Sequence, residues 1–351
     1  MNLSDSKKKL AIAGVICGLV GAALAYFGNP ANMAICVACF IRDTAGALKL
    51  HSAPVVQYVR PEIVGMVLGA FAISIGTKEY RSSGGSSPMT RFVLGMIIMI
   101  GSLVFLGCPL RMVIRMSAGD LNAYVALIGF IGGVATGAFA LKKGFSLGRA
   151  HETNAMSGAI LPALLVGVMI LSLCTTLLAV SKEGPGSMHA PIMIALVGGL
   201  IFGVFAQKSR MCFAGSIRDV ILMKNFDLLT VIGGLFVVML IYNVVTGGFH
   251  ISFANQPIAH MEHLWNVLGM YAVGFAAVLA GGCPLRQLIL AGQGSSDGAV
   301  TVLGLFAGAA MCHNFGLASS GEGTTPAGRI ACVIAIAVCF LIGFVGNKRK
   351  A

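Results

Sequence analysis

A five-residue sequence, Gly-Cys-Pro-Leu-Arg, occurs twice in the chain, at residues 107–111 and at residues 282–286. A second motif, Cys-x-x-x-x-Ile-Arg-Asp, precedes each copy and begins at Cys36 in the first half and at Cys212 in the second. The two motifs therefore recur in the same order at offsets of 175 and 176 residues. Such a recurrence indicates an internal duplication, and the residues that both halves keep are the first candidates for function.

The duplicated residues with reactive or charged side chains are four cysteines and four arginines. They are Cys36, Cys108, Cys212, Cys283, Arg42, Arg111, Arg218 and Arg286. A thiol is a weak, polarisable hydrogen-bond partner, poorly suited to oxygen anions alone but suited to an exposed sulfur or selenium atom. The arginines add fixed positive charges that are costly at membrane depth. We expect these eight residues to bind a small anion that contains sulfur or selenium.

A structural interpretation competes with this one. The cysteines could simply pack as small apolar side chains. Each arginine could hold its own loop through a carboxylate, for which the sequence offers Asp43, Asp219, Asp120 and Asp297.

Cys36 and Cys39 have the C-x-x-C spacing of thiol oxidoreductases, so a membrane thiol oxidoreductase is the alternative function. The second half has Gly215 in place of Cys39, which argues against a shared dithiol. No nucleotide-binding or metalloprotease motif appears, and we expect neither a cofactor, nor a bound metal, nor an enzyme.

Cys312, His313 and Asn314 form a polar group inside an apolar stretch and are secondary candidates, as is Cys39. Together with the 18 methionines, Cys312 and His313 raise the possibility of soft-metal transport, which the repeated arginines oppose. His313 and Asn314 either bond across helices or line a pore.

The composition determines which elements hold these residues. Apolar residues make up 57% of the chain and charged residues 10%, whereas soluble domains carry roughly 25% charge. The mean hydropathy is +0.90. The net charge of +12 comes from lysines and arginines scattered over short loops, as on the cytoplasmic side of membrane proteins, so no nucleic-acid partner is expected. The chain is predicted to be a multi-pass membrane protein in contact with lipid.

Ten apolar segments are long enough to span a bilayer. They are residues 10–27, 61–77, 92–106, 121–141, 157–180, 190–206, 226–246, 264–281, 298–316 and 329–346. Shorter segments at 29–43, 107–120, 207–219 and 283–294 are predicted to be re-entrant. Pro109 and Pro284 suit the first turn of a half-helix, which would place the preceding cysteines at helix N-termini, where anions are favoured.

The predicted fold is therefore an all-α polytopic membrane protein made of two repeats, residues 1–180 and 181–351, of about five transmembrane helices each. An odd number of spans per repeat inverts the second repeat, and re-entrant half-helices then meet near the midplane. The distribution of Lys and Arg predicts that both termini lie in the cytoplasm. Cys36 and Cys108 would approach from outside, and Cys212 and Cys283 from the cytoplasm.

The chain also resembles a known family. Its sequences Arg-Met-Cys-Phe-Ala-Gly-Ser-Ile-Arg-Asp at 210–219, Ala-Gly-Gly-Cys at 280–283 and Ala-Gly-Gln-Gly at 291–294 are similar to those of the YeeE/YedE sulfur-transport family, and the resemblance covers essentially the whole chain, in both halves. The resemblance implies a thiosulfate-importer-like protein of the bacterial inner (plasma) membrane that passes its anion along the four repeated cysteines. It also implies a cytoplasmic TusA-like sulfur-carrier protein as a possible partner. The Pro-Leu-Arg after Cys108 and Cys283 looks more like the YedE branch, which is linked to selenium metabolism.

Overall fold

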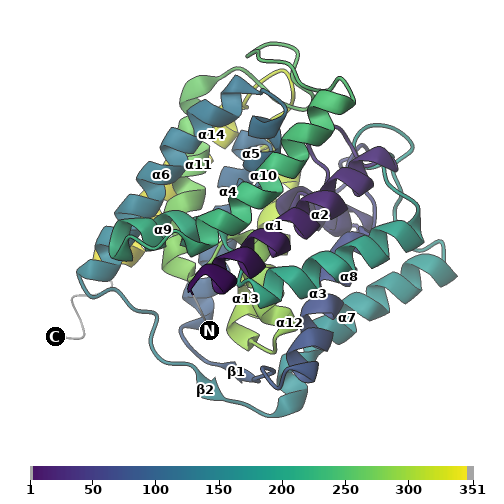
Figure 1. The fold of residues 1–351 in the computed structure, drawn as a ribbon. Coiled ribbons are helices and arrows are strands. Elements are labelled where there is room, and N and C mark those ends of the chain that lie inside the picture. The colour runs from purple at the N-terminus through teal and green to yellow at the C-terminus, as the bar shows by residue number, and fades with distance from the viewer. Residues whose placement is uncertain (1–2, 346–351) are drawn as a thin grey trace.

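The computed structural model describes residues 3–345 of the chain, which fold into a bundle of helices (Figure 1). Ten helices are long: α1 (Leu3–Tyr26), α3 (Pro61–Gly76), α4 (Pro88–Phe105), α6 (Leu121–Lys142), α7 (Ala155–Cys174), α8 (Ile192–Lys208), α10 (Asp227–Val245), α11 (His263–Ala280), α13 (Ser296–Asn314) and α14 (Pro326–Phe340). Four are short: α2 (Val37–Ala47), α5 (Pro109–Ser117), α9 (Phe213–Met223) and α12 (Pro284–Gly292). A π-helical turn, η1 (Leu341–Val345), extends α14, and the two-residue strands β1 (Ser83–Gly84) and β2 (His151–Glu152) pair antiparallel.

Eight helical segments of the described chain are long and apolar enough to cross a membrane, three of them counted together with a following short helix. This finding confirms the all-α polytopic membrane class, but the count is lower than the ten predicted spans. The two that fall short are α3, which has only 16 residues, and α13, which carries Asp297, His313 and Asn314. The predicted span 157–180 is also too long, because α7 ends at Cys174 and Thr175 is extended.

Both halves contain the same order of long and short helices, α1–α7 and α8–α14, and they interlock. Helix α1 packs against α10, and α8 packs against α3 in the equivalent contact. Likewise α6 packs against α11, visible side by side in Figure 1, and α13 packs against α4. The main contacts of each half are therefore made with the other half. The division at residue 180 stays a prediction.

Small residues let these helices approach closely. On α3, a Cβ at Gly65 would lie 2.3 Å from the carbonyl oxygen of Leu196, and one at Gly69 would lie 2.1 Å from that of Leu200. From the first contact to the second, the residue numbers rise along both helices, so α3 and α8 run parallel.

Corresponding helices run in opposite directions. Asp297, in the first turn of α13, accepts hydrogen bonds from the backbone N–H groups of Gly85 and Ser86, just before α4 begins. Helix α6 is the counterpart of α13 in the first half. The chain reaches this same region after α6 ends, because the Ser87 hydroxyl donates to the carbonyl of Leu147. Helix α13 thus begins near the end of the bundle at which α6 ends. Which end faces the cytoplasm stays a prediction, and the basic residues 348–350 lie outside the described chain.

Loops collect at the two ends of the bundle. At the end where α2 lies, which we call the α2 end, Asn29 bonds to the backbone of Ala190 and Asn32 bonds to Gln256. These bonds join the loops that follow α1, α7 and α10. At the opposite end, the α9 end, the backbone N–H of Arg81 donates to the carbonyl of Gln293.

Candidate functional site

Each of the four short helices begins directly after a motif cysteine. Cys36 is the N-cap residue of α2, Cys108 of α5, Cys212 of α9 and Cys283 of α12, all with extended backbone. Proline occupies the first helical position of α5 and α12, where its missing N–H has no helical partner to lose. The helices are displaced from the predicted segments: α2 begins later than residue 29 and continues to Ala47, and α9 continues past Asp219 to Met223.

The N-termini of α2 and α5 meet at two thiols, which we call the α2–α5 thiol pair. The Sγ atoms of Cys36 and Cys108 lie 3.7 Å apart, and the two residues are 0% and 1% exposed. The backbone N–H of Cys39 donates to the Cys36 sulfur at 3.5 Å. Cys36 therefore faces the cysteine of the other motif, 72 residues away, across the junction of two helices.

In the second half, the buried motif cysteines Cys212 and Cys283 lie close enough for their thiols to influence each other, and we call them the α9–α12 thiol pair. The backbone N–H of Gly215 donates to the Cys212 sulfur at 3.2 Å, as that of Cys39 does in the first half. Short helices from opposite ends also touch, since α2 contacts α12 and α5 contacts α9. The two thiol pairs are thus joined through contacts between the helices that carry them.

A cavity of about 580 Å³ reaches the second thiol pair from the α9 end, and we call it the vestibule. Its charged lining consists of Lys208, Arg210, Arg218, Arg286, Asp219 and Asp227. Cys212 lies at its wall and is 7% exposed. Four cations against two carboxylates make the vestibule attractive to an anion.

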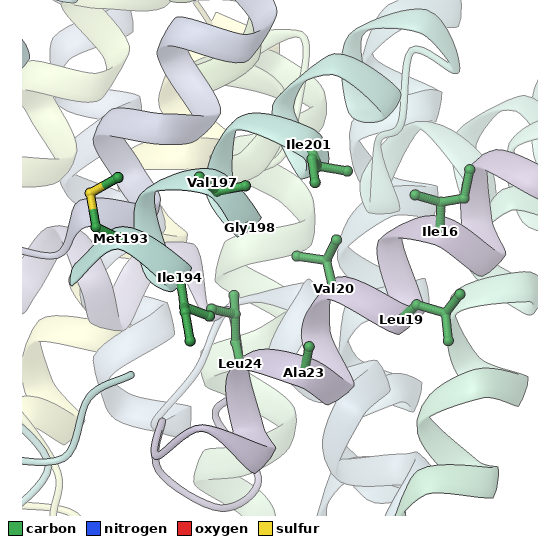
Figure 2. Close-up of a pocket in the computed structure, with 10 residues that line it drawn as sticks. All are labelled: Ile16, Leu19, Val20, Ala23, Leu24, Met193, Ile194, Val197, Gly198 and Ile201. Carbon is green, nitrogen blue, oxygen red and sulfur yellow. The ribbon is translucent and has the colours of Figure 1, made fainter. Parts of the chain in front are cut away.

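Figure 2 shows a second cavity of about 540 Å³, between α1 and α8, that is similar in size but opposite in character. Its lining is entirely apolar and includes Leu19, Val20, Leu24, Met193 and Val197. This cavity offers an anion neither a positive charge nor a hydrogen-bond donor. The two cavities therefore differ in the chemistry of their linings and not in their size.

Arg111 and Arg286 occupy equivalent positions in the two repeats, but their surroundings differ. The fully buried Arg111 donates to the carbonyl oxygens of Asn32 at 2.9 Å, Ile258 at 3.1 Å and Leu106, and to the Cys39 sulfur at 3.5 Å. It therefore fastens two loops of the α2 end beside the α2–α5 thiol pair.

Arg286 is only partly buried, lines the vestibule and donates to the side-chain oxygen of Gln207 at 3.3 Å. Asp120 and Asp297, which the sequence suggested as partners for Arg111 and Arg286, pair with other arginines. Asp120 pairs with Arg115 at 2.6 Å and Asp297 with Arg91 at 3.5 Å, so that part of the loop-holding interpretation is wrong for Arg111 and Arg286.

The other two motif arginines do pair with the adjacent aspartate. Arg218 lies 2.8 Å from Asp219, and Arg42 lies 2.7 Å from Asp43. Asp43 also binds Arg60 at 2.7 Å, in a buried cluster that sequence reasoning missed. Arg60 has no counterpart in the second half, so the repeat could not reveal it.

The secondary candidates lie at the α2 end of α13. The ring of His313 stacks on that of His51 with centroids 4.5 Å apart, and Asn314 donates to the carbonyl of Leu50 at 2.9 Å. The buried Cys312 precedes them. These contacts bind α13 to the loop after α2, which is the bonding across helices that the sequence allowed.

Residues 208–344, from the end of α8 into η1, match a family model described as sulphur transport. The match covers 137 of the 351 residues and shows that this part of the chain is similar to the sulphur-transport family. This confirms the resemblance seen in the motifs at residues 210–219, 280–283 and 291–294. The matched segment contains the α9–α12 thiol pair and most of the vestibule lining.

The chain is also similar to a curated protein, the thiosulfate transporter TsuA of Spirochaeta thermophila. The two sequences are 28% identical over 104 residues, which is 29% of this chain and 31% of the relative. The aligned part thus spans about a third of that protein.

Proposed function

We propose that this protein is a transporter rather than an enzyme, and that it carries a small sulfur-containing anion across the bacterial inner membrane into the cytoplasm. The match of residues 208–344 to the sulphur-transport family and the similarity to a protein named a thiosulfate transporter support this proposal. Thiosulfate is the first candidate cargo, and a selenium-containing anion is the second because of the Pro-Leu-Arg that follows Cys108 and Cys283.

The observation that carries the proposal is the presence of two buried thiol pairs, each at a junction of two helix N-termini. Free N–H groups and the helix dipole favour an anion at such a junction. An anion with both oxygen and terminal sulfur atoms matches the mixed lining, because its oxygens accept from N–H groups while its sulfur contacts the thiols. Neither an oxygen anion nor a cation would use both kinds of group.

The anion would pass from the α2–α5 thiol pair to the α9–α12 thiol pair and leave through the vestibule. Arg286 and Arg218 would hold it there by charge, since Arg286 forms no ion pair with a carboxylate of the described residues and Arg218 lies at the wall of the same cavity. Import requires that the α9 end face the cytoplasm, as the predicted topology has it. A TusA-like sulfur carrier would then collect the anion at the mouth of the vestibule.

The test is uptake of labelled thiosulfate, with labelled selenite as the competing cargo, in a bacterial strain that lacks its own importers. We expect the wild-type chain to accumulate one of the two anions and Arg286→Ala to reduce that uptake at an unchanged amount of protein. Arg329→Ala is the matched control, because this arginine is also partly exposed but pairs with Glu262 and does not line the vestibule. Absence of uptake of either anion by well-expressed protein would contradict the proposal.

A further inference from the structure

A buried carboxyl group lies outside the thiol pairs and the vestibule. Glu62 stands in the first turn of α3, directly after Pro61, and is 0% exposed. Its Oε1 accepts a hydrogen bond from the Asn29 amide at 2.8 Å. Its Oε2 has no hydrogen-bond partner among the described residues.

Among the residues that the structure describes, no cation forms an ion pair with this carboxyl group, although Arg60 acts on it electrostatically. The neighbouring Arg60 is the nearest candidate, but its guanidinium is engaged by Asp43 and by the carbonyl oxygens of Met188 and Pro185. A buried carboxylate that accepts a hydrogen bond from one neutral amide, away from water, is costly, whereas a neutral carboxylic acid costs much less to bury.

The other titratable groups near Glu62 are few. Tyr58 precedes it in the chain, and Asp43 on α2 adds a like charge. Helix α8 packs against this turn through Gly199, where a Cβ would lie 2.4 Å from the Glu62 carbonyl oxygen, so it presents backbone there. None of these groups adds a positive charge beside an ionised Glu62.

Asn29 connects Glu62 to the segment that leads into the α2–α5 thiol pair. Its amide also donates to the carbonyl of Ala34 at 2.7 Å, and its oxygen accepts from the N–H of Ala190 at 2.9 Å. Ala34 lies two residues before Cys36, and Ala190 lies just before α8. A change in the charge of Glu62 would thus act on the amide that holds these two segments together.

A series of titratable rings leads from the surface of the α2 end toward Glu62. His189, which is partly exposed, stacks on Tyr58 with ring centroids 4.0 Å apart and an angle of 5° between the planes. Tyr58 is 8% exposed and lies close enough to Glu62 to interact with it electrostatically. Tyr58 and His189 are therefore the groups that separate Glu62 from the surface on this side.

We propose that Glu62 is the binding site for a proton that is co-transported with the anion, an inference that rests on the proposed transport function. Proton binding converts the carboxylate into a neutral acid with no other bond made or broken. The neutral form relieves a buried charge next to the Asn29 amide, and the anion binds at the thiol pair to which that amide is connected. An inward proton gradient then drives uptake of the anion against its own gradient.

The test uses the purified full chain in proteoliposomes, with labelled thiosulfate as the cargo and an imposed pH gradient. An inward gradient of one pH unit can support about a tenfold accumulation for each proton carried. Wild type should accumulate thiosulfate under the gradient, whereas Glu62→Gln should exchange internal for external thiosulfate but lose the accumulation. Glu183→Gln, an exposed carboxyl on the loop after α7, is the matched control and should behave as wild type. Accumulation by Glu62→Gln equal to that of wild type would overturn the proposal.

A second measurement is independent of transport. Infrared difference spectra recorded across a pH titration should show the band of a protonated carboxyl in wild type and in Glu183→Gln, and should lack it in Glu62→Gln. If Glu62→Gln does not fold, Glu62→Asp serves instead, because the shorter acid shifts that band. Absence of the band in wild type overturns the proton site. Wild type that shows the band but moves no thiosulfate contradicts the proposed cargo and leaves the proton site supported.

Discussion

Replacing the two equivalent arginines Arg111 and Arg286 by alanine should have opposite consequences for folding and transport. Arg111 donates to three backbone carbonyl oxygens and one sulfur in a fully buried place. Arg286 makes one hydrogen bond, to Gln207, and borders the vestibule. We therefore expect Arg111→Ala to lower the amount and stability of folded protein, and Arg286→Ala to lower anion uptake by folded protein.

The magnitudes follow from what each substitution leaves behind. A hydrogen bond from a charged group contributes about 1.5–3 kcal/mol, and a buried carbonyl left without a partner costs about 1–3 kcal/mol. Arg111→Ala would leave three carbonyl oxygens without this donor. We therefore expect the free energy of unfolding to fall by at least about 3 kcal/mol, even though the contributions of the three hydrogen bonds are not additive. Total stabilities are about 5–15 kcal/mol, so this is a large share. The single, part-exposed bond of Arg286 is worth about 1 kcal/mol or less.

The assay is thermal unfolding of detergent-purified protein, followed by the fluorescence of the single tryptophan, Trp265, together with its size-exclusion profile. Arg111→Lys is the informative companion, because a lysine can satisfy only part of the carbonyl set. It should fall between wild type and Arg111→Ala. Equal stability of Arg111→Ala and Arg286→Ala would refute the distinction drawn between the two positions.

Three further outcomes are expected. Asp43→Asn leaves two buried arginines without their carboxylate and should destabilise the protein by about 3–5 kcal/mol. Asp219→Asn removes a partner from a part-exposed ion pair and should cost about 1 kcal/mol or less, and the unfolding temperatures of the two variants test this difference. In chains that keep one cysteine at a time, a maleimide should label Cys212 faster than Cys36, and equal rates would argue against the vestibule. Reporters fused after Lys182 and at the C-terminus should report opposite sides of the membrane, and the same side would exclude the inverted arrangement.

The sequence predicted the helical membrane class and the short helices because both depend on local signals. Apolar length sets the spans, and the proline after Cys108 and Cys283 marks the start of a helix. The duplication supplied the motif positions. That Cys36 faces Cys108 could not be predicted, because it depends on how α2 and α5 pack and not on spacing along the chain.

The arginine contacts were harder to predict for a related reason. The partners of Arg111 are backbone carbonyl oxygens, which every residue has and no motif marks. Arg60 and Arg115 occur in one half only, so a search for repeated residues passes over both, although each is fully buried. Glu62 likewise has no motif, and only its burial and its unpartnered oxygen single it out.

Thiosulfate flux into proteoliposomes containing cysteine variants tests the central claim most directly. If the anion passes both thiol pairs, alanine at Cys36, Cys108, Cys212 or Cys283 should each lower the flux, by roughly fivefold for the loss of a bond worth ~1 kcal/mol. Serine, which keeps a donor, should lower it less, and Cys39→Ala should have the smallest effect of the five alanine variants. A thiol oxidoreductase built on Cys36 and Cys39 predicts the reverse order. Loss of flux confined to Cys36→Ala and Cys39→Ala, with Cys283→Ala unaffected, would contradict passage of the anion along the two thiol pairs.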